Sequence, residues 1–296
     1  LKNLLNDREI INFGVPAPLQ RFIASKISAK RSKIVAPHYQ KMGGGSPQLA
    51  LTQELLAKVA PLYKEKSGRE LDTFTAMCYW HPYIEDTVKT VMKGDYDRII
   101  LLPMYPQYSS TTTGACFNRF NRAISKTPPR GVITRVSQFH TDSGYLKSLA
   151  LRIQEAAARL DKGMGGVHLL FSAHSLPQSV IDAGDPYLDQ IYEQIGELVK
   201  ILEPRSFSLA FQSKLGRMKW LTPSVTDEMK RLAQLQISDI VVLAISFVND
   251  HIETLIELDD DLIPKGRELG LKIERAETLN AADDFAESIA KLLVGV

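Results

Sequence analysis

The chain has 296 residues, of which 44% are hydrophobic and 24% charged, and this composition predicts a globular protein with a sizeable core. Its formal net charge of +2 gives no sign of electrostatic capture of nucleic acid, so we expect no nucleic-acid partner. The longest apolar run, residues 240–248, is much shorter than the roughly 20 residues of a membrane span. The two cysteines are too few for a disulfide framework, which is typical of the reducing cytoplasm.

Charge is unevenly distributed along the chain. Residues 1–53 hold eight basic and two acidic side chains, whereas residues 251–296 hold five basic and eleven acidic ones. We therefore expect an anionic partner to bind near the start of the chain and a cation near its end. The chain begins at Leu1 without an initiator Met and shows no signal peptide, so we expect its N-terminus to be incomplete.

Strand and helix patterns alternate from residue 73 onward. The predicted strands are 73–79, 98–102, 132–136, 167–171, 206–211, 240–245 and 272–276. The predicted helices are 83–93, 112–125, 143–160, 186–202, 223–235, 251–263 and 281–293. The strands are rich in Val, Ile and Leu without strict alternation, which indicates an α/β protein whose parallel sheet is covered on both faces.

The strand count indicates two similar halves. Four predicted strands lie in residues 143–296, and three lie in residues 1–142. If the halves are related, the first strand is missing from the front. We therefore predict two Rossmann-like halves, 1–142 and 143–296, each a four-stranded parallel sheet flanked by helices. Ligands bind such sheets at the carboxyl ends of the strands, so the loops that follow strands are the places to look for chemistry.

One such loop, FSAHSLPQSVIDAGDPY at residues 171–187, places His174 just beyond a predicted strand. A neutral imidazole there can accept a proton or bind a metal ion. The alternative is a histidine that is merely hydrogen-bonded within a loop. Ser172, Ser175 and the GDPY turn surround it with specific loop chemistry, which favours a functional role.

A second loop, SFVNDHIETLIELDDD at residues 246–261, begins a predicted helix with Glu253 in its first turn. Glu257 shares its face at the i+4 position and Asp261 continues the row, so these carboxylates could pass a hydrated cation inward. The alternative is the solvated face of an amphipathic helix. Asp250 and His251 add polar partners at the strand end, which favours a site.

Because a parallel sheet brings both loops to one rim, we expect a cleft in which an imidazole faces a carboxylate. Two more loops reach this rim, at residues 101–114 and 211–223. Flat aromatic faces with nearby cations suit a large planar anionic ligand, whereas the alternative is ordinary loop packing. The aromatic and apolar side chains that these loops deliver are Met104, Tyr105, Tyr108 and Trp220.

Two glycine patterns argue against nucleotide binding. The stretch KMGGGSPQ at residues 41–48 lacks the P-loop spacing of Lys and Ser or Thr, and it predicts a tight turn that leads into a helix. No GxGxxG follows a predicted strand, which disfavours a dinucleotide-dependent oxidoreductase.

Residues 15–33 combine an apolar stripe with basic side chains. The stripe consists of Leu19, Phe22, Ile23 and Ile27. This segment could lie on an anionic membrane surface, as a peripheral contact, or pack on its own domain as a lid.

Together these motifs resemble the ferrochelatase family, lyases of haem biosynthesis that insert ferrous iron into a porphyrin. The resemblance spans nearly the whole chain, and its most specific parts are FSAHSLP followed by GDPY, and DHIETL after a strand. It implies two Rossmann-like halves with the porphyrin in the cleft between them. The matching motifs are GGGSP at 43–47, YPQYSSTTTG at 105–114, FSAHSLP and GDPY within 171–187, FQSKLGRMKWLTP at 211–223 and NDHIETLIELD at 249–259.

The resemblance also implies roles for particular residues. His174 takes a pyrrole proton or binds the incoming metal, and Glu253 is its carboxylate partner. Glu257 and Asp261 resemble the family's acidic row, so the implied metal-binding set is His174, Glu253, Glu257 and Asp261. The implied porphyrin contacts are Ser46, Met104, Tyr105, Tyr108, Tyr187 and Trp220.

Some positions depart from the family pattern. Cys78 stands where relatives commonly have an arginine, so recognition of the porphyrin carboxylates would depend on cations such as Lys214, Arg217 or the N-terminal basic residues. Some relatives carry an iron–sulfur cluster, but this chain has no C-terminal cysteine and has Ser110 where some of them place one. We therefore predict no cluster and no other tightly bound cofactor, with ferrous iron and porphyrin as the partners.

The leading hypothesis is insertion of Fe2+ into protoporphyrin IX, because the SAHSLP and DHIETL motifs look closest to members that use this substrate. Coproporphyrin III is the nearest alternative substrate. A non-catalytic tetrapyrrole-binding protein on the same fold is a further alternative, and it would need the aromatic loops but not Glu253.

Overall fold

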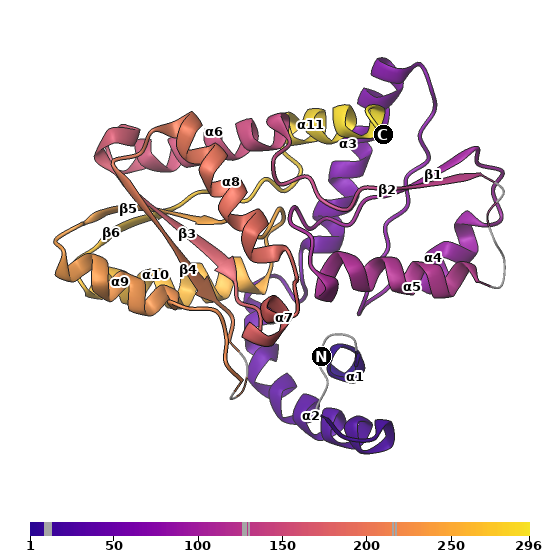
Figure 1. Ribbon diagram of the computed structural model, residues 1–296, viewed down its shortest axis with the longest axis horizontal. Helices are drawn as coiled ribbons and strands as arrows, with labels where there is room; N and C mark the ends of the chain where they lie inside the picture. The colour runs from indigo at the N-terminus through magenta and orange to yellow at the C-terminus, as the bar shows by residue number, and fades with distance from the viewer. Residues whose placement is uncertain (9–13, 126–128, 130, 215, 217) are drawn as a thin grey trace.

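The structure, a computed structural model, describes the chain except for residues 9–13, 126–128, 130, 215 and 217. Helices and parallel strands alternate along most of it (Figure 1). The helices are α1 (Lys2–Asn6), α2 (Ala17–Lys41), α3 (Gln48–Ser67), α4 (Ile84–Val91), α5 (Ala115–Ile124), α6 (Ser143–Arg159), α7 (Gln178–Asp182), α8 (Tyr187–Leu202), α9 (Val225–Gln234), α10 (Ile263–Glu268) and α11 (Asp283–Val294). The strands are β1 (Arg98–Leu101), β2 (Val132–Arg135), β3 (His168–His174), β4 (Ser206–Gln212), β5 (Asp239–Ala244) and β6 (Lys272–Arg275). Two π-helical segments, η1 (Ser110–Gly114) and η3 (Glu253–Leu262), and a 3-10 turn, η2 (Met164–Gly166), complete the set.

The second half of the chain builds a four-stranded parallel sheet with the order β4-β3-β5-β6. Helices α6 and α8 cover one face, and α9 and α10 cover the other (Figure 1). Successive residues of β3 enter different cores, since Leu169 and Phe171 pack with α6 and α8 whereas Leu170 packs with α9. The continuous apolar strands therefore form a sheet buried on both faces, which confirms the predicted α/β class.

The first half builds a smaller sheet than expected. Among the described residues it contains β1 and β2 alone, parallel and in the register Arg98↔Val132, where three strands of a sheet that lacks its first strand were predicted. The predicted strand 73–79 is wrong: in place of a neighbouring strand, the backbone of Met77 pairs with the turn that follows it, at residues 82–84. The Met77 N–H donates to Pro82 O at 2.8 Å and Met77 O accepts from the Ile84 N–H at 3.3 Å, so these groups are satisfied without a neighbouring strand.

Packing crosses the predicted boundary between residues 142 and 143. Helix α3 lies against α11 (Figure 1), and its buried Leu55 and Val59 belong to the main core, on the α6 and α8 side of the large sheet. The turn predicted at 41–48 is confirmed, with Gly43 and Gly44 at φ of 96° and 94° directly before α3. Positive φ is easily adopted only by glycine, which explains the glycine run. The division into two halves stays a prediction.

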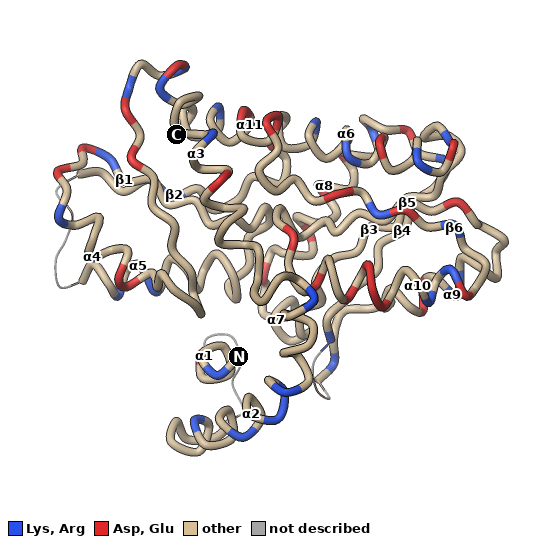
Figure 2. The backbone as a smooth tube through the Cα atoms, turned by 180° about the vertical axis from the view of Figure 1, so that it is seen from behind, with Lys and Arg blue, Asp and Glu red and all other residues tan. Residues whose placement is uncertain are grey.

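Helix α2 projects from the rest of the chain and carries basic side chains with no acidic ones (Figure 2). Its buried residues are Gln20 and Ala24, and Gln20 Nε2 donates to Leu5 O of α1 at 3.2 Å. Leu19 and Phe22 remain 47% and 61% exposed. Within the described chain, no helix has the length and apolar character needed to cross a membrane.

Candidate functional site

The centre of the candidate site is a direct contact between His174 and Glu253. His174 is the last residue of β3, and Glu253 is the first residue of η3, which follows β5 on the neighbouring strand. The His174 Nδ1–H donates to Glu253 Oε2 at 2.9 Å. The sequence placed His174 two or three residues beyond the strand, but β3 runs further and includes it. The prediction that the parallel sheet brings these two side chains to one rim is confirmed.

Electrostatics favour an ionised carboxylate beside a basic imidazole. Burial by itself lowers the pKa of His174, but the negative charge and hydrogen bond of Glu253 outweigh it and raise the pKa above its ordinary value. Burial opposes ionisation of Glu253 too, yet His174 and then His251 hold its pKa well below the usual range. The side chains remain 34% and 28% exposed, so the pair is open to a ligand. Such a pair can accept protons and hold a cation.

The backbone around His174 is fixed by Tyr187 and Ser246. The Tyr187 hydroxyl donates to His174 O at 2.9 Å and lies 2.6 Å from Ser246 Oγ, which accepts from the His174 N–H at 3.2 Å. Tyr187 is 5% exposed, and burial raises the pKa of its phenol, so it stays a neutral donor. The structure thus supports a positioning role for Tyr187, and its contact with a porphyrin stays a prediction.

The acidic row continues from Glu253 on a π-helix. The sequence predicted a single helix over 251–263, but η3 has wider turns and passes into α10. The Glu257 carboxylate accepts from the Ser213 N–H at 2.7 Å and from the Ser213 hydroxyl. Gln212 Nε2 donates to Glu253 O at 2.9 Å, so the end of β4 fixes the start of the row. Isolated π-helical turns occur often at functional sites.

Asp261 lies apart from the central pair. It is exposed and forms an ion pair with Lys265 at 2.6 Å on the same helical surface. Among the described residues, no three His, Cys, Asp or Glu side chains are grouped closely enough to hold a metal ion together. A metal set of His174, Glu253, Glu257 and Asp261 is therefore not assembled as one cluster, and a stepwise route along these residues stays a prediction.

Asp250 and His251 lie in the turn between β5 and η3 and help to position Glu253. Asp250 accepts from Asn280 Nδ2 and Thr254 Oγ1, both at 2.9 Å, and it lies 3.4 Å from the Arg275 guanidinium. His251 Nε2 lies 3.6 Å from Glu253 Oε2. These contacts fix the turn between β5 and η3, and therefore the position of the Glu253 backbone.

The predicted porphyrin contacts are only partly open to solvent. Tyr105 is 38% exposed and Ser46 is exposed in the turn before α3, whereas Met104, Tyr108 and Trp220 are half-buried. The backbone of Trp220 forms an isolated antiparallel β-bridge with Pro177, in the loop that follows His174. Lys214 is exposed, and Arg217 lies outside the described residues.

Sequence reasoning did not identify Gln212, Ser213 and Ser246 as site residues. Each follows or ends a strand, at the same edge as His174, which is the signal that could have indicated them. Their side chains bond to the backbone or carboxylates of the central residues, which hydropathy patterns do not show.

The fold is that of chelatases. The solved SirB protein of Bacillus subtilis, determined with Fe3+, has a TM-score of 0.60 at 11% identity, covering 81% of this chain and 87% of that one. CbiX, described as the terminal enzyme of sirohaem biosynthesis in denitrifying bacteria, has a TM-score of 0.58 at 18% identity, covering 85% of this chain and 94% of that one. Likeness at such low identity establishes the architecture alone.

The family follows from sequence. The family model described as Ferrochelatase matches residues 1–295. A ferrochelatase of Geotalea uraniireducens is 38% identical over 99% of this chain and 90% of its own length, and one of Aquifex aeolicus is 34% identical over 99% and 92%. One of Gloeobacter violaceus is 33% identical over 99% and 90%. The chain belongs to the ferrochelatase family, and the resemblance stated from its motifs is confirmed.

Proposed function

We propose that this chain inserts ferrous iron into protoporphyrin IX, with His174 and Glu253 as the residues that act on the reacting atoms. The observation that carries the proposal is the 2.9 Å contact between His174 Nδ1 and Glu253 Oε2 at the carboxyl edge of the large sheet. Family membership supports the reaction class, and the choice of protoporphyrin IX rests on the SAHSLP and DHIETL motifs.

Metal insertion requires the porphyrin to lose two pyrrole protons and the metal ion to shed water. The raised pKa of His174 makes its imidazole a stronger base, suited to accept a pyrrole proton. Glu253 stays anionic, so it stabilises the resulting imidazolium and attracts the incoming cation. The fixed backbone of His174 keeps both groups in place while the macrocycle bends, which favours the distorted form over the flat one.

Further residues are proposed to guide the two substrates. Glu257 and then Asp261 offer carboxylates on the helix that begins at Glu253, and we propose that they pass the metal ion toward the pair. Side chains on the neighbouring loops would contact the macrocycle. These are Ser46, Met104, Tyr105, Tyr108, Tyr187 and Trp220. Iron enters as a substrate, and we propose that no iron–sulfur cluster or other cofactor takes part.

Residues 15–33 are proposed as a peripheral contact with an anionic membrane surface. Leu19 and Phe22 are exposed on α2, and Lys26 Nζ lies 5.6 Å from the centroid of the Phe22 ring. Apolar side chains next to cations suit the boundary between acyl chains and anionic headgroups. We place the protein in the cytoplasm, at the inner face of that membrane.

The test is anaerobic insertion of Fe2+, followed by absorbance, with protoporphyrin IX and coproporphyrin III compared in parallel. We expect faster insertion into protoporphyrin, and a fall of about 10²- to 10⁴-fold in His174→Ala and in Glu253→Ala. Glu65→Ala, an exposed carboxylate on α3, is the matched control and should retain full activity.

The other outcomes identify the alternatives. Preferred insertion into coproporphyrin would overturn the proposed substrate and leave the reaction class intact. Tight porphyrin binding with no insertion, in the parent protein and in Glu253→Ala alike, would indicate a tetrapyrrole carrier.

A further inference from the structure

The two cysteines of the chain meet in the first half of the molecule. Cys78 lies in the loop before α4, and Cys116 is the second residue of α5. Their Sγ atoms are 3.3 Å apart, and both are free thiols with half-buried side chains. The chain has no third cysteine, so any thiol chemistry in this protein belongs to these two residues.

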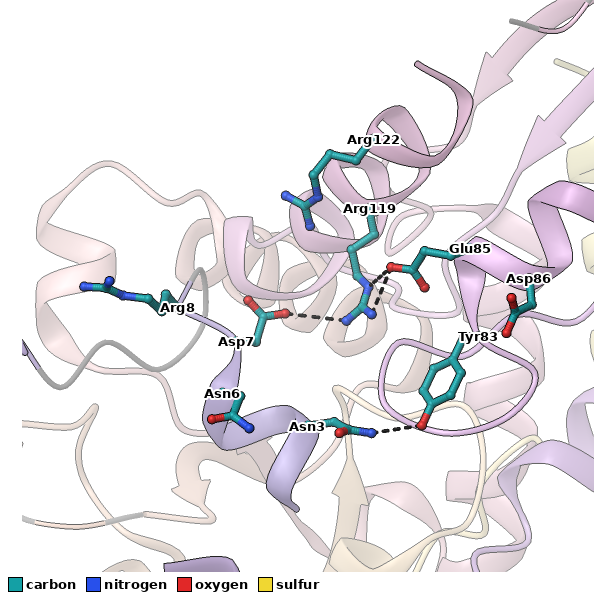
Figure 3. Close-up of a pocket in the computed structure, with 9 residues that line it drawn as sticks. All are labelled: Asn3, Asn6, Asp7, Arg8, Tyr83, Glu85, Asp86, Arg119 and Arg122. Carbon is teal, nitrogen blue, oxygen red and sulfur yellow. Dashed lines mark hydrogen bonds and ion pairs between the residues drawn. The ribbon is translucent and has the colours of Figure 1, made fainter. Parts of the chain in front are cut away.

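An arginine network surrounds the thiol pair. Arg119, one turn after Cys116, forms ion pairs with Glu85 at 3.0 Å and with Asp7 at 3.6 Å, and dashed lines mark both pairs in Figure 3. Its guanidinium lies 5.5 Å from the Tyr79 ring centroid. Arg119 also lines an open cavity of about 590 Å³ together with Asn3, Asp7, Tyr83 and Glu85. Arg119 thus places a positive charge on the helix that carries Cys116, and the cavity lies on the far side of this arginine network, since neither cysteine lines it.

This environment gives the two sulfurs different roles. The thiol hydrogen bond from Cys116 lowers the pKa of Cys78, and Arg119 adds to that effect against the opposing effect of burial. The same contact, together with burial, raises the pKa of Cys116. Cys78 is thus the more acidic thiol of the pair, which suits it to attack first, with Cys116 to resolve.

The pair also lies close to the substrate side of the molecule. Cys116 is two residues after the end of η1, and η1 ends the loop that carries Tyr105. Tyr105 and Cys116 therefore stand on one short connection, residues 102–116, which runs from the end of β1 through η1 into the first turn of α5. A change at the pair is therefore expected to reach a proposed porphyrin contact.

We propose that Cys78 and Cys116 form a redox-responsive site, which a small-molecule disulfide oxidises to an intramolecular disulfide that displaces the Tyr105 loop. The Cys78 thiolate attacks one sulfur of R–S–S–R, which forms a mixed disulfide and releases RS⁻. The released RS⁻ takes the proton of Cys116, whose thiolate attacks the Cys78 sulfur and releases the second RS⁻. Two protein sulfurs are oxidised and one R–S–S–R is reduced to two thiols.

The first experiment detects the bond without any use of activity. The intact protein is treated anaerobically with glutathione disulfide, free thiols are alkylated, and the mass is measured before and after addition of dithiothreitol. We expect loss of both alkylatable thiols with a mass lower by two hydrogens, and full recovery on reduction. Cys78→Ser and Cys116→Ser should each show at most a glutathione adduct, and the double variant no change.

Two results would overturn the redox site. One is that both thiols stay alkylatable at high glutathione disulfide, and the other is that the oxidised product consists of disulfide-linked dimers or of adducts without ring closure. Either result is independent of whether the protein inserts iron.

The second experiment tests the link to Tyr105, and this part rests on the proposed function. Closing the sulfur gap from 3.3 Å to a bond of about 2.05 Å moves α5 or its neighbouring loop by about 1 Å, so we expect insertion to slow by about tenfold in the oxidised protein. The double variant Cys78→Ser, Cys116→Ser should insert iron at the same rate after treatment with glutathione disulfide as after treatment with dithiothreitol. Equal rates in the oxidised and reduced protein would overturn the link, whereas no insertion in either form would count against the proposed function alone.

Discussion

The two parallel sheets of the molecule differ in how well they are covered. Every residue of β3 from His168 to Ala173 is buried, whereas β1 and β2 are exposed or half-buried along their length. The larger sheet supplies both His174 and Glu253, and the smaller one supplies the loop with Tyr105. The proposed chemistry is thus built on the better-covered sheet, and close packing of the supporting strands helps to hold two groups at a fixed distance.

The less covered half is held in place by the other. Gln107 Nε2 donates to Ile245 O at 3.0 Å, and the Tyr108 N–H donates to Gln190 Oε1 at 2.7 Å. These bonds fix the loop after β1 on the large sheet and on α8. The position of the loop after β1, which carries the proposed porphyrin contacts Tyr105 and Tyr108, therefore depends on contacts with the second half of the chain rather than on the small sheet.

The largest effect we expect comes from opening a cavity in each sheet by the same substitution. Ile240 on β5 is 0% exposed, and Ile240→Ala should lower the free energy of unfolding by about 2–5 kcal/mol. Ile133 on β2 is half-buried, and Ile133→Ala should cost about 1–2 kcal/mol because less apolar surface is lost. Urea unfolding of both variants measures the difference, and equal losses would contradict the contrast between the sheets.

The buried His168 on β3 makes the stability of the large sheet depend on pH. His168 is 2% exposed between Ser206 Oγ and Ser208 Oγ, each 2.8 Å from a ring nitrogen, and burial lowers the pKa of His168 to about 4. Between about pH 6.5 and this value the unfolded chain binds a proton that the folded chain does not, so stability falls as pH falls through this range. From pH 7.5 to 5 this group alone should remove about 2 kcal/mol from the free energy of unfolding.

The variant His168→Gln isolates that contribution. Glutamine cannot titrate and keeps a donor and an acceptor, so the variant should lose less stability than the parent protein between pH 7.5 and 5. Urea unfolding at the two pH values measures both changes. An equal pH dependence in the two proteins would contradict the lowered pKa, because it would show that His168 takes up its proton equally readily in the folded and unfolded chain.

The sequence predicted the large sheet well and the small sheet poorly, for a physical reason. Buried strands such as 240–245 must be continuously apolar, and this pattern is visible in the letters. Segment 73–79, TFTAMCY, has the β-branched and aromatic residues of a strand without a continuous apolar run, and the loop at Pro82 bonds to the backbone of Met77, a contact that leaves no periodic signal. In the site, residue types and sheet topology indicated His174 and Glu253, whereas Gln212 and Ser213 act through side-chain geometry that only the fold reveals.

The smallest effect we expect comes from removing the hydrogen bonds that join Asp185 to the loop at Ser109 and Ser110. Asp185 Oδ2 accepts from the Ser109 hydroxyl at 3.0 Å and from the Ser110 N–H and hydroxyl, each at 2.7 Å. Asp185→Ala leaves buried Ser109 without this acceptor, so we expect a loss of about 1–2 kcal/mol in the free energy of unfolding and a raised KM for porphyrin, because the Tyr105 loop is less well fixed. Asp182→Ala, three residues earlier and exposed, is the matched control. An unchanged KM in Asp185→Ala would mean that the bonds of Gln107 and Tyr108 hold the loop without the Asp185 hydrogen bonds. The smaller half would then depend less on these contacts with the larger half than its packing indicates.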